Sequence, residues 1–297
     1  MAFGGIAVCL SHVNCIACSF LIDAGVMKKS RLTVFGSLRI VVFGVVMALV
    51  SGEVIAARVV KIAAVHFPPY VVRPEQGVDS GLLIKLVAAL NALQQDYQFV
   101  TVPASVPRRY RDLIQGRIDM AIFENPDWGW AGIAYDKVDM GLEDAEVFVA
   151  RRAEGRGQEY FDDLSDKRLA LFSGYHYGFA DFNADPHYLN DKLKVTLTYS
   201  HDSNVLMVAR GRADVAPVTR SYLTDFMARY RGDARQLMVS ERADQVYRQY
   251  ALLRPGANID AAHFSRLLER LRENGVLASI FEPWHIKVLY GPNAPGG

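Results

Sequence analysis

Apolar residues along this chain fall into short continuous runs that alternate with segments of helical periodicity. The runs at 59–65, 97–102 and 118–123 have the length and β-rich composition of buried strands. Between the first two runs, apolar residues recur on one face of a helix that Asp79 or Ser80 would cap: Leu83, Leu86, Val87, Leu90 and Leu93. A short helix is expected from Pro107 to Ile114, and residues 147–150 predict a further strand after a long loop rich in Trp and Gly.

The second half of the chain repeats this alternation. We expect strands at 169–172, 195–198, 214–218 and 250–253, and helices at 203–209 and 220–230. Asp260 would cap a helix whose apolar face is Phe264, Leu267, Leu268 and Leu271, and Gly275 would close it before a short apolar helix at 276–284. Strands that alternate with helices predict an α/β fold with mainly parallel sheets.

Two stretches, 113–122 and 208–217, read alike. Each has the end of an apolar-periodic helix, then Gly-Arg-x-Asp beginning at Gly116 or Gly211, then a short apolar run. Glycine suits the left-handed position that closes a helix, and the run after the aspartate suits a buried strand. The repeat therefore predicts two similar α/β lobes with a cleft between them, which is where small ligands usually bind.

Residues 27–57 have the pattern of a secretory signal peptide. A positive segment runs from Met27 to Arg39, residues 40–50 carry no charge, and small-residue cleavage patterns end at Ala56 and Ala57. The apolar run is short for a bilayer span, although an uncleaved anchor is the alternative. Because signal peptides begin at their charged end, we expect translation to start at Met27 and residues 1–26 to be an upstream extension; a weak membrane segment at 3–22 is the other interpretation. The protein is accordingly expected in the periplasm.

Cysteine content and charge narrow the choice of partners. Cys9, Cys15 and Cys18 all lie in the upstream extension, so the exported chain would contain no disulfide and would rest on a large core. No Cys/His set at zinc spacing and no phosphate-binding loop is found, so neither a metal nor a cofactor is expected. The chain has 33 basic and 32 acidic residues, which predicts no basic face and argues against nucleic acid as a partner.

Several segments, taken in order, resemble the type II periplasmic solute-binding proteins of the amino-acid type (solute-binding protein family 3), which serve ABC importers. They are Lys-Ile-Ala-Ala-Val-His-Phe-Pro-Pro-Tyr at 61–70, Gly-Leu-Leu at 81–83, the two Gly-Arg-x-Asp segments, and a tail from Leu267 to Trp284. The resemblance covers about residues 59–286. It implies two lobes joined by two hinge-crossing strands, with an interlobe cleft. In this chain 58–150 would form lobe 1, 151–246 lobe 2, and 247–297 would return to lobe 1, after 1–57 as extension and signal peptide.

The resemblance also implies a function. Such a protein is not an enzyme: it closes on a small organic solute and delivers it to an ABC permease in the inner membrane, here as a monomer. Two other functions stay open at this point. One is a dehydratase-like periplasmic enzyme on the same scaffold, with Glu124 and His176 as an acid/base pair. The other is a sensor that carries its ligand to a membrane receptor.

Ligands of such sheets collect at the carboxyl ends of the strands. Nine residues at or near those ends are candidates for ligand contact: Tyr70, Arg108, Glu124, Asn125, Trp128, Ser173, Tyr175, His176 and Thr219. Tyr70 matches the family's aromatic platform, Arg108 matches an arginine of divergent members, and residues 173–176 match its anion site at a helix start. Four of them have a structural alternative: Tyr70 as a packed turn aromatic, Glu124 as a solvated loop acid, Trp128 as part of a lobe-packing cluster and Arg108 as an exposed helix-start arginine.

Two anchors of the family's amino-acid binders are missing from this sequence. The Thr-x-x-Arg pair that holds the ligand carboxylate falls near Trp128 and Ala131, and the acid that holds the α-ammonium falls at Thr219. Unpaired ligand charges cost several kcal/mol on desolvation, so such a site would bind a free α-amino acid poorly. The resemblance therefore predicts the fold and a small-molecule ligand more firmly than it predicts an amino acid as that ligand.

Overall fold

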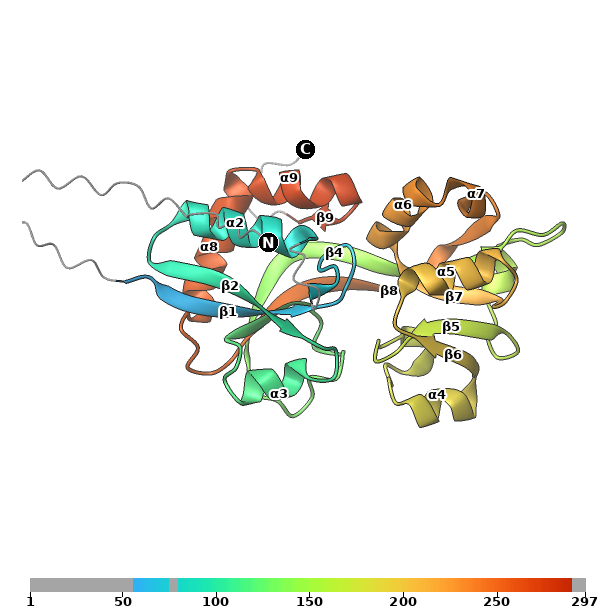
Figure 1. Cartoon of the computed structure of the whole chain (residues 1–297), viewed down its shortest axis with the longest axis horizontal. Helices are drawn as coiled ribbons and strands as arrows, with labels where there is room; N and C mark the ends of the chain where they lie inside the picture. The colour runs from blue at the N-terminus through green and yellow to red at the C-terminus, as the bar shows by residue number, and fades with distance from the viewer. Residues whose placement is uncertain (1–55, 75–79, 290–297) are drawn as a thin grey trace, which may run out of the picture. The chain divides into compact units, whose positions relative to one another are not determined.

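The computed structural model describes residues 56–74 and 80–289, which form a mixed α/β structure (Figure 1). Their strands are β1 (Arg58–Val65), β2 (Tyr97–Ala104), β3 (Met120–Glu124), β4 (Asp136–Arg151), β5 (Arg168–Phe172), β6 (Lys194–Thr198), β7 (Val215–Thr219), β8 (Leu237–Leu253) and β9 (Lys287–Val288). Their α-helices are α2 (Leu82–Leu93), α3 (Arg109–Ile114), α4 (Pro186–Lys192), α5 (His201–Ala209), α6 (Arg220–Arg229), α7 (Arg231–Ala234), α8 (Ala261–Glu273) and α9 (Val276–Phe281). Short 3-10 turns occur at Gln158–Phe161, Gly178–Ala180 and Glu282–Trp284.

The strand order β2-β1-β3-β8-β4-β7-β5-β6 defines two lobes on either side of a central antiparallel pair. In the first lobe β1 is parallel to β2 and β3, and in the second β5 is parallel to β6 and β7. The long strands β4 and β8 pair with each other, and they also join β3 at one end and β7 at the other. Figure 1 shows these two strands running side by side from one lobe to the other. The expected parallel sheets and crossing strands are thus confirmed.

Apolar faces of the helices bury against both lobes. In the first lobe, α2 packs on β2, α8 packs on β4, and α9 packs against α2 and α8 (Figure 1). Leu86, Phe99, Phe264 and Phe281 share one buried cluster. Residues from both ends of the described chain therefore build this core. In the second lobe, α5 and α6 contribute to a second cluster, in which Phe226 is fully buried.

The Gly-Arg-x-Asp segments form the same local structure in both lobes. Gly116 has φ +69° and Gly211 has φ +71°, so each adopts the left-handed conformation that ends a helix. In the first lobe the backbone N–H of Asp119 donates to the carbonyl of Lys61 (2.8 Å), and the N–H of Lys61 donates to Oδ2 of Asp119 (2.9 Å). Asp119 thereby fixes the start of β3 to the parallel strand β1.

Asp214 makes the equivalent contacts in the second lobe. Its N–H donates to the carbonyl of Arg168, and the N–H of Arg168 donates to Oδ2 of Asp214, both at 2.8 Å. The two strands that follow end at Glu124 and Thr219, which are equivalent positions of the repeat. Both side chains are consequently placed at the carboxyl ends of strands that face the middle of the molecule.

The crossing strands are much longer than the sequence pattern indicated. Residues 147–150 and 250–253 were expected, whereas β4 spans Asp136–Arg151 and β8 spans Leu237–Leu253. Both strands carry charged residues, among them the buried Asp144 and Glu146 of β4. Hydropathy alone therefore assigns these segments to loops. Tertiary hydrogen bonding outweighs this local polarity.

The start of α2 also differs from the expectation. Its N-cap is Gly81 at φ +107° with no side-chain cap, while Oγ of Ser80 donates to the carbonyl of Val72 (3.2 Å). A Cβ atom at Gly81 would lie 2.6 Å from the carbonyl oxygen of Tyr70, so close approach of the backbone requires glycine here. Similarly, α3 begins at Arg109 rather than at Pro107. The other candidate cap, Asp79, lies outside the described residues.

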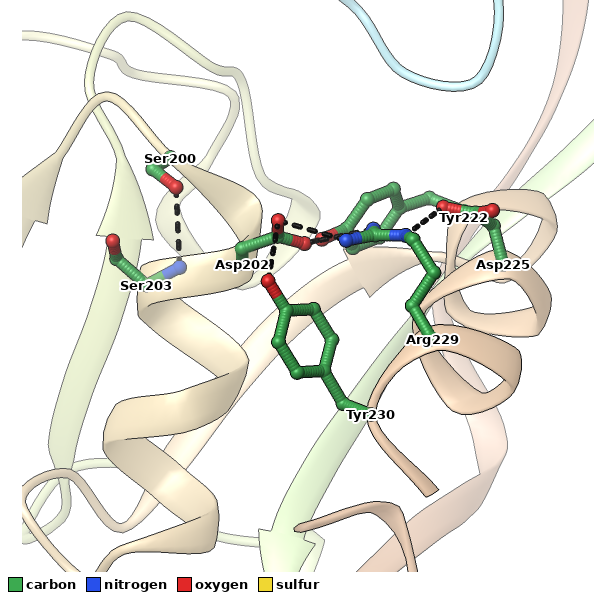
Figure 2. Close-up of polar contacts among 7 residues, drawn as sticks. All are labelled: Ser200, Asp202, Ser203, Tyr222, Asp225, Arg229 and Tyr230. Atoms are coloured by element: carbon green, nitrogen blue, oxygen red, sulfur yellow. Dashed lines mark hydrogen bonds and ion pairs between the residues drawn. The ribbon is translucent and has the colours of Figure 1, made fainter. Parts of the chain in front are cut away.

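A polar cluster holds α5 against α6 in the second lobe (Figure 2). Asp202 accepts hydrogen bonds from both terminal nitrogens of Arg229 (2.9 Å each) and from the hydroxyls of Tyr222 and Tyr230. Nε of Arg229 also donates to Asp225 (2.6 Å). Figure 2 shows these groups converging on the Asp202 carboxylate, so one acid fixes the packing of two helices.

The predicted signal peptide, the Met27 start and the three cysteines fall in residues 1–55, outside the described part of the chain. Within residues 56–74 and 80–289, no helix has both the length and the apolar character needed to cross a membrane.

Candidate functional site

A pocket lies where the first lobe, the second lobe and the crossing strands meet. It encloses about 610 Å³ of space, its opening to solvent included. Its lining is Ala63, Val65, His66, Phe67, Val71, Val106, Arg109, Ile122, Phe123, Glu124, Trp128, Glu146, Gly174, Tyr175, His176, Tyr177, Gln245 and Tyr247. Side chains from both lobes therefore surround one space, and most of them are apolar or aromatic.

Four of the candidate residues line this pocket: Glu124, Trp128, Tyr175 and His176. Arg108 does not, because it is exposed at the N-cap of α3, and the neighbouring Arg109 faces the pocket instead. Thr219 is completely buried behind Glu146.

Tyr70, Asn125 and Ser173 also lie outside the lining. Tyr70 is fully buried beneath Phe67, with 4.9 Å between ring centroids, and its hydroxyl donates to Oδ2 of Asp144 (2.7 Å). Nδ2 of Asn125 donates to the carbonyl of Arg248 (3.3 Å), and Ser173 is half-buried. Tyr70 thus supports the pocket wall from behind. It has the packed position that was named above as the structural alternative to a ligand-contacting aromatic.

Arg109 and Glu124 form a buried ion pair in the wall of the pocket. Nε of Arg109 lies 2.8 Å from Oε1 of Glu124, and both side chains are almost inaccessible to solvent. Nε1 of Trp130 donates to Oε2 of the same carboxylate (2.9 Å). Burial raises the pKa of Glu124, and Arg109 and Trp130 act against that rise. Because each charge has its partner, this wall adds almost no net charge to the pocket.

Glu146 is a second buried acid in the lining, and no basic side chain of residues 56–74 and 80–289 forms an ion pair with it. Its residue is 3% exposed, and Oγ1 of Thr219 donates to Oε2 (3.3 Å). Oε1 is buried and accepts no hydrogen bond from any group of the described residues. Burial, followed by the charges of Asp244 and Asp144, raises the pKa of Glu146 well above its usual value. Oε1 of Glu146 and the hydroxyl of Tyr247 are thus two buried polar atoms of the lining that have no hydrogen-bond partner among the described residues.

Aromatic rings from several elements form the apolar walls. The ring of Trp128 meets Tyr247 edge-on at 4.9 Å and Phe67 edge-on at 5.9 Å. Phe67 in turn meets Tyr175 of the second lobe at 5.7 Å. Such walls favour an apolar or cationic group over an anionic one.

Hydrogen bonds connect the lobes around the pocket. The hydroxyl of Tyr175 donates to the carbonyl of His66 (3.2 Å), and the hydroxyl of Tyr110 lies 3.2 Å from Nε2 of His176. Nε1 of Trp128 donates to the side chain of Gln245 on β8 (3.2 Å). Burial lowers the pKa of His176, which favours the neutral ring. The lobes are thus in direct contact at the rim, which corresponds to a closed arrangement.

Sequence reasoning missed several lining residues because they lie on the crossing strands. Glu146, Gln245 and Tyr247 occur in segments where no strand was expected. The sequence offered little signal there, because Asp139, Glu143, Asp144 and Glu146 together give this part of β4 the polarity of a loop. In the part of the chain that the structure describes, no group of three or more His, Cys, Asp or Glu side chains is placed to hold a metal ion.

Comparisons with known proteins agree on the fold. No protein-family model and no curated protein matches the sequence. Among solved structures, a putative ABC transporter binding component from Wolinella succinogenes, complexed with lysine, is 14% identical with a TM-score of 0.60, over 76% of this chain and 95% of that one. A histidine kinase sensor domain with similarity to periplasmic binding proteins is 20% identical, with a TM-score of 0.60, over 79% of this chain and 98% of that one.

A third similar structure is the ancestral amino-acid-binding protein AncCDT-1, a precursor of cyclohexadienyl dehydratase. It is 18% identical with a TM-score of 0.57, over 82% of this chain and 98% of that one. At these identities the likeness establishes architecture alone. The chain has the two-lobe fold of type II periplasmic binding proteins, as the resemblance implied.

Proposed function

We propose that this protein is a periplasmic receptor that holds one small organic solute between its lobes and delivers it to an ABC importer. The observation that carries the proposal is the pocket itself, which takes its lining from both lobes and from the strands that join them. The solute-binding proteins among the structural neighbours support this role, because they use the same fold to bind small molecules.

The physical mechanism is a shift in population. A solute that contacts Trp128 on one lobe and Tyr175 on the other makes both contacts only when the lobes are closed. It therefore binds the closed form better than the open form, and this difference in affinity drives closure. A permease that recognises the closed form would then distinguish the loaded receptor from the empty one.

An enzyme on the same scaffold is the second candidate, and AncCDT-1 is the observation that favours it. Glu124 and His176 both line the pocket, as an acid/base pair would. However, Glu124 is held by Arg109 and Trp130. Nδ1 of His176 lies 2.6 Å from the carbonyl oxygen of Phe182, and Nε2 lies 3.2 Å from the hydroxyl of Tyr110, so both ring nitrogens have partners. Neither group has the free proton-transfer position that catalysis requires, so we favour binding without chemistry.

The sensor remains a third candidate, because a histidine kinase sensor domain shares the fold. Measurements of solute uptake and of the transcriptional response distinguish an importer's receptor from a sensor. Cells that lack the protein should fail to accumulate the labelled solute if it serves an importer. They should accumulate it normally, but lose a transcriptional response to it, if the protein is a sensor.

Native mass spectrometry of protein purified without refolding tests the receptor function. We expect one small molecule per chain, which is released unchanged on denaturation and is recovered unchanged after prolonged incubation with the protein. Recovery of a chemically altered compound would support the enzyme instead. Failure of the protein to bind any solute from a periplasmic extract would contradict both.

A further inference from the structure

We propose that Glu146 is the anchor for a positively charged group, and that the pocket takes a small organic cation of the alkylammonium class. This inference rests on the proposed receptor function and adds to it the chemistry of the solute.

The first argument is the unsatisfied oxygen of Glu146. The side chain lines the pocket and is nine-tenths or more buried, yet among the described residues its one hydrogen-bond partner is Thr219, which donates to Oε2. A buried carboxylate oxygen without a donor is costly, and folded proteins rarely leave one so. A cationic N–H beside Oε1 would supply the missing donor, and a quaternary ammonium, which has no N–H, would supply the opposite charge without a hydrogen bond.

The second argument is the balance of charge around this carboxyl. Asp144 on the same strand and Asp244 on β8 are its charged neighbours, and both raise its pKa after burial itself. These two acids are satisfied: Asp144 accepts from Tyr70 and Ser221, and Asp244 accepts from two backbone N–H groups. Burial raises the pKa of both acids, and the charge of Arg242 opposes that rise at Asp244, so this end of the pocket is acidic rather than basic.

The remaining groups that face Glu146 are neutral. They are Thr219 on β7, Tyr175 and Tyr177 from the segment after β5, and Tyr247 on β8. Arg109 is the one arginine or lysine in the pocket lining of the described residues, and it already pairs with Glu124. A ligand carboxylate would therefore find no unpaired arginine or lysine there, whereas a ligand cation finds an unpaired acid.

The third argument is the aromatic character of the pocket walls. Trp128, Tyr247 and Tyr175 present aromatic rings to the same space, and the faces of such rings attract ammonium groups. An acid at the end of an aromatic pocket favours a charged head group on a compact apolar body. It also disfavours anions, because they would be desolvated beside a negative charge.

Isothermal titration calorimetry with two matched probes tests the proposal. Choline carries the cation, and 3,3-dimethylbutan-1-ol has nearly the same shape without the charge; acetate serves as the anionic probe. We expect choline to bind the wild-type chain, the neutral isostere to bind at least about tenfold more weakly, and acetate not to bind.

Glu146→Gln is the decisive variant because it keeps the volume and the contact with Thr219 but removes the charge. It should weaken choline binding on the order of 30-fold or more and leave the weak binding of the neutral isostere unchanged. Its Tm should not fall, because the amide replaces a carboxyl whose charged form is disfavoured by burial and by two nearby acids. Glu143→Gln, on the same strand but with its carboxylate near Lys287 at the surface, is the matched control and should bind choline as the wild type does.

Three results would overturn the inference: equal affinity for choline and its neutral isostere, undiminished choline binding by Glu146→Gln, or preferential binding of acetate. In each of these the pocket still binds a solute, so the receptor function survives. If a solute isolated with the protein proves neutral or anionic, the inference likewise fails while the receptor function stands. Absence of binding to all three probes and to periplasmic extract would remove the receptor function as well.

Discussion

Glu146 on β4 lies directly opposite Thr219 on β7, and the threonine hydroxyl donates a hydrogen bond of 3.3 Å to Oε2 of the glutamate. Thr219 is the position at which the resembling family carries an acid, and that absence argued against a charged ligand anchor. The pairing of two strands brings a carboxyl to the same neighbourhood from a different part of the chain. A side chain that is missing at one position of a sheet can thus have a counterpart at the position opposite it on the neighbouring strand.

The pH dependence of cation binding should report on this carboxyl. Burial and the charges of Asp244 and Asp144 raise the pKa of Glu146, and a bound cation would lower that pKa again, so cation binding should release a proton at pH values near the raised pKa. Affinity for choline should therefore fall as the pH drops below that pKa and rise above it. Calorimetry in two buffers of different ionisation enthalpy would detect the released proton, and Glu146→Gln should abolish both effects. A pH-independent affinity of the wild type would contradict this account.

Substitution of Trp128 should change mainly the affinity for the solute, whereas substitution of Tyr70 should change mainly the stability of the fold. Trp128 lines the pocket, so Trp128→Ala should weaken solute binding by about 1–3 kcal/mol. Tyr70 lies behind the wall, and Tyr70→Phe removes the hydrogen bond to the buried Asp144, which should lower the free energy of unfolding by about 1–3 kcal/mol with affinity nearly unchanged. Denaturant unfolding and calorimetry on both variants check this, and the reverse pattern would place Tyr70 in the site.

The ion pair of Arg109 and Glu124 should show strong coupling. Arg109→Met leaves the Glu124 carboxyl buried without its charge partner, which should cost about 3–5 kcal/mol of stability. Adding Glu124→Leu should restore much of that loss, because both buried charges are then gone. A double-mutant cycle by urea unfolding measures the coupling, and simple additivity of the two single effects would show that the pair is not linked in this way.

His201 should make the fold sensitive to acid. Its ring is fully buried and stacks on Phe172 at 4.7 Å, and burial lowers its pKa from 6.5 to about 3. The unfolded chain binds this proton more readily than the folded one, so stability is fully present above about pH 6.5 and decreases as the pH falls from there toward 3.

His201→Phe should reduce this loss, because the stacked ring remains but no longer titrates. The comparison is the free energy of unfolding at pH 7.5 and pH 4.5, with His187→Phe at an exposed position as the control. The buried acids titrate in the opposite direction, so the prediction concerns the difference between variant and wild type. An identical pH dependence of the two would exclude His201 as the cause.

The cluster in Figure 2 predicts unequal effects at two aspartates. Asp202→Ala removes the acceptor shared by Arg229, Tyr222 and Tyr230, and should destabilise the chain by about 1–2 kcal/mol after allowance for solvent screening. Asp225→Ala removes one surface ion pair within α6 and should cost less than about 0.5 kcal/mol. Thermal unfolding of both variants provides the measurement, and equal effects would show that the cluster does not hold the helices together.

Local sequence was a sound guide to the lobes because their elements follow local rules. Gly116 and Gly211 end helices in the left-handed conformation, and Asp260 caps α8, where its side chain accepts from the N–H of His263. Such features depend on a few neighbouring residues, so spacing and composition reveal them. The repeat also placed Glu124 at a strand end facing the pocket.

The centre of the site could not be predicted in this way. Glu146 and Tyr247 belong to long strands whose polar residues resemble loops, and only the pairing of β4 with β8 reveals them as strands. Tyr70 and Arg108 were chosen from motif position, yet burial of one and exposure of the other depend on packing between distant segments. Long-range pairing therefore decides which of two adjacent residues, such as Arg108 and Arg109, reaches the pocket.

The most direct test of the central claim is a crystal structure of the protein with the solute that copurifies with it. The account predicts one molecule between Trp128, Tyr247 and Glu146, in contact with both lobes. A solute bound elsewhere, or one that contacts a single lobe only, would contradict it.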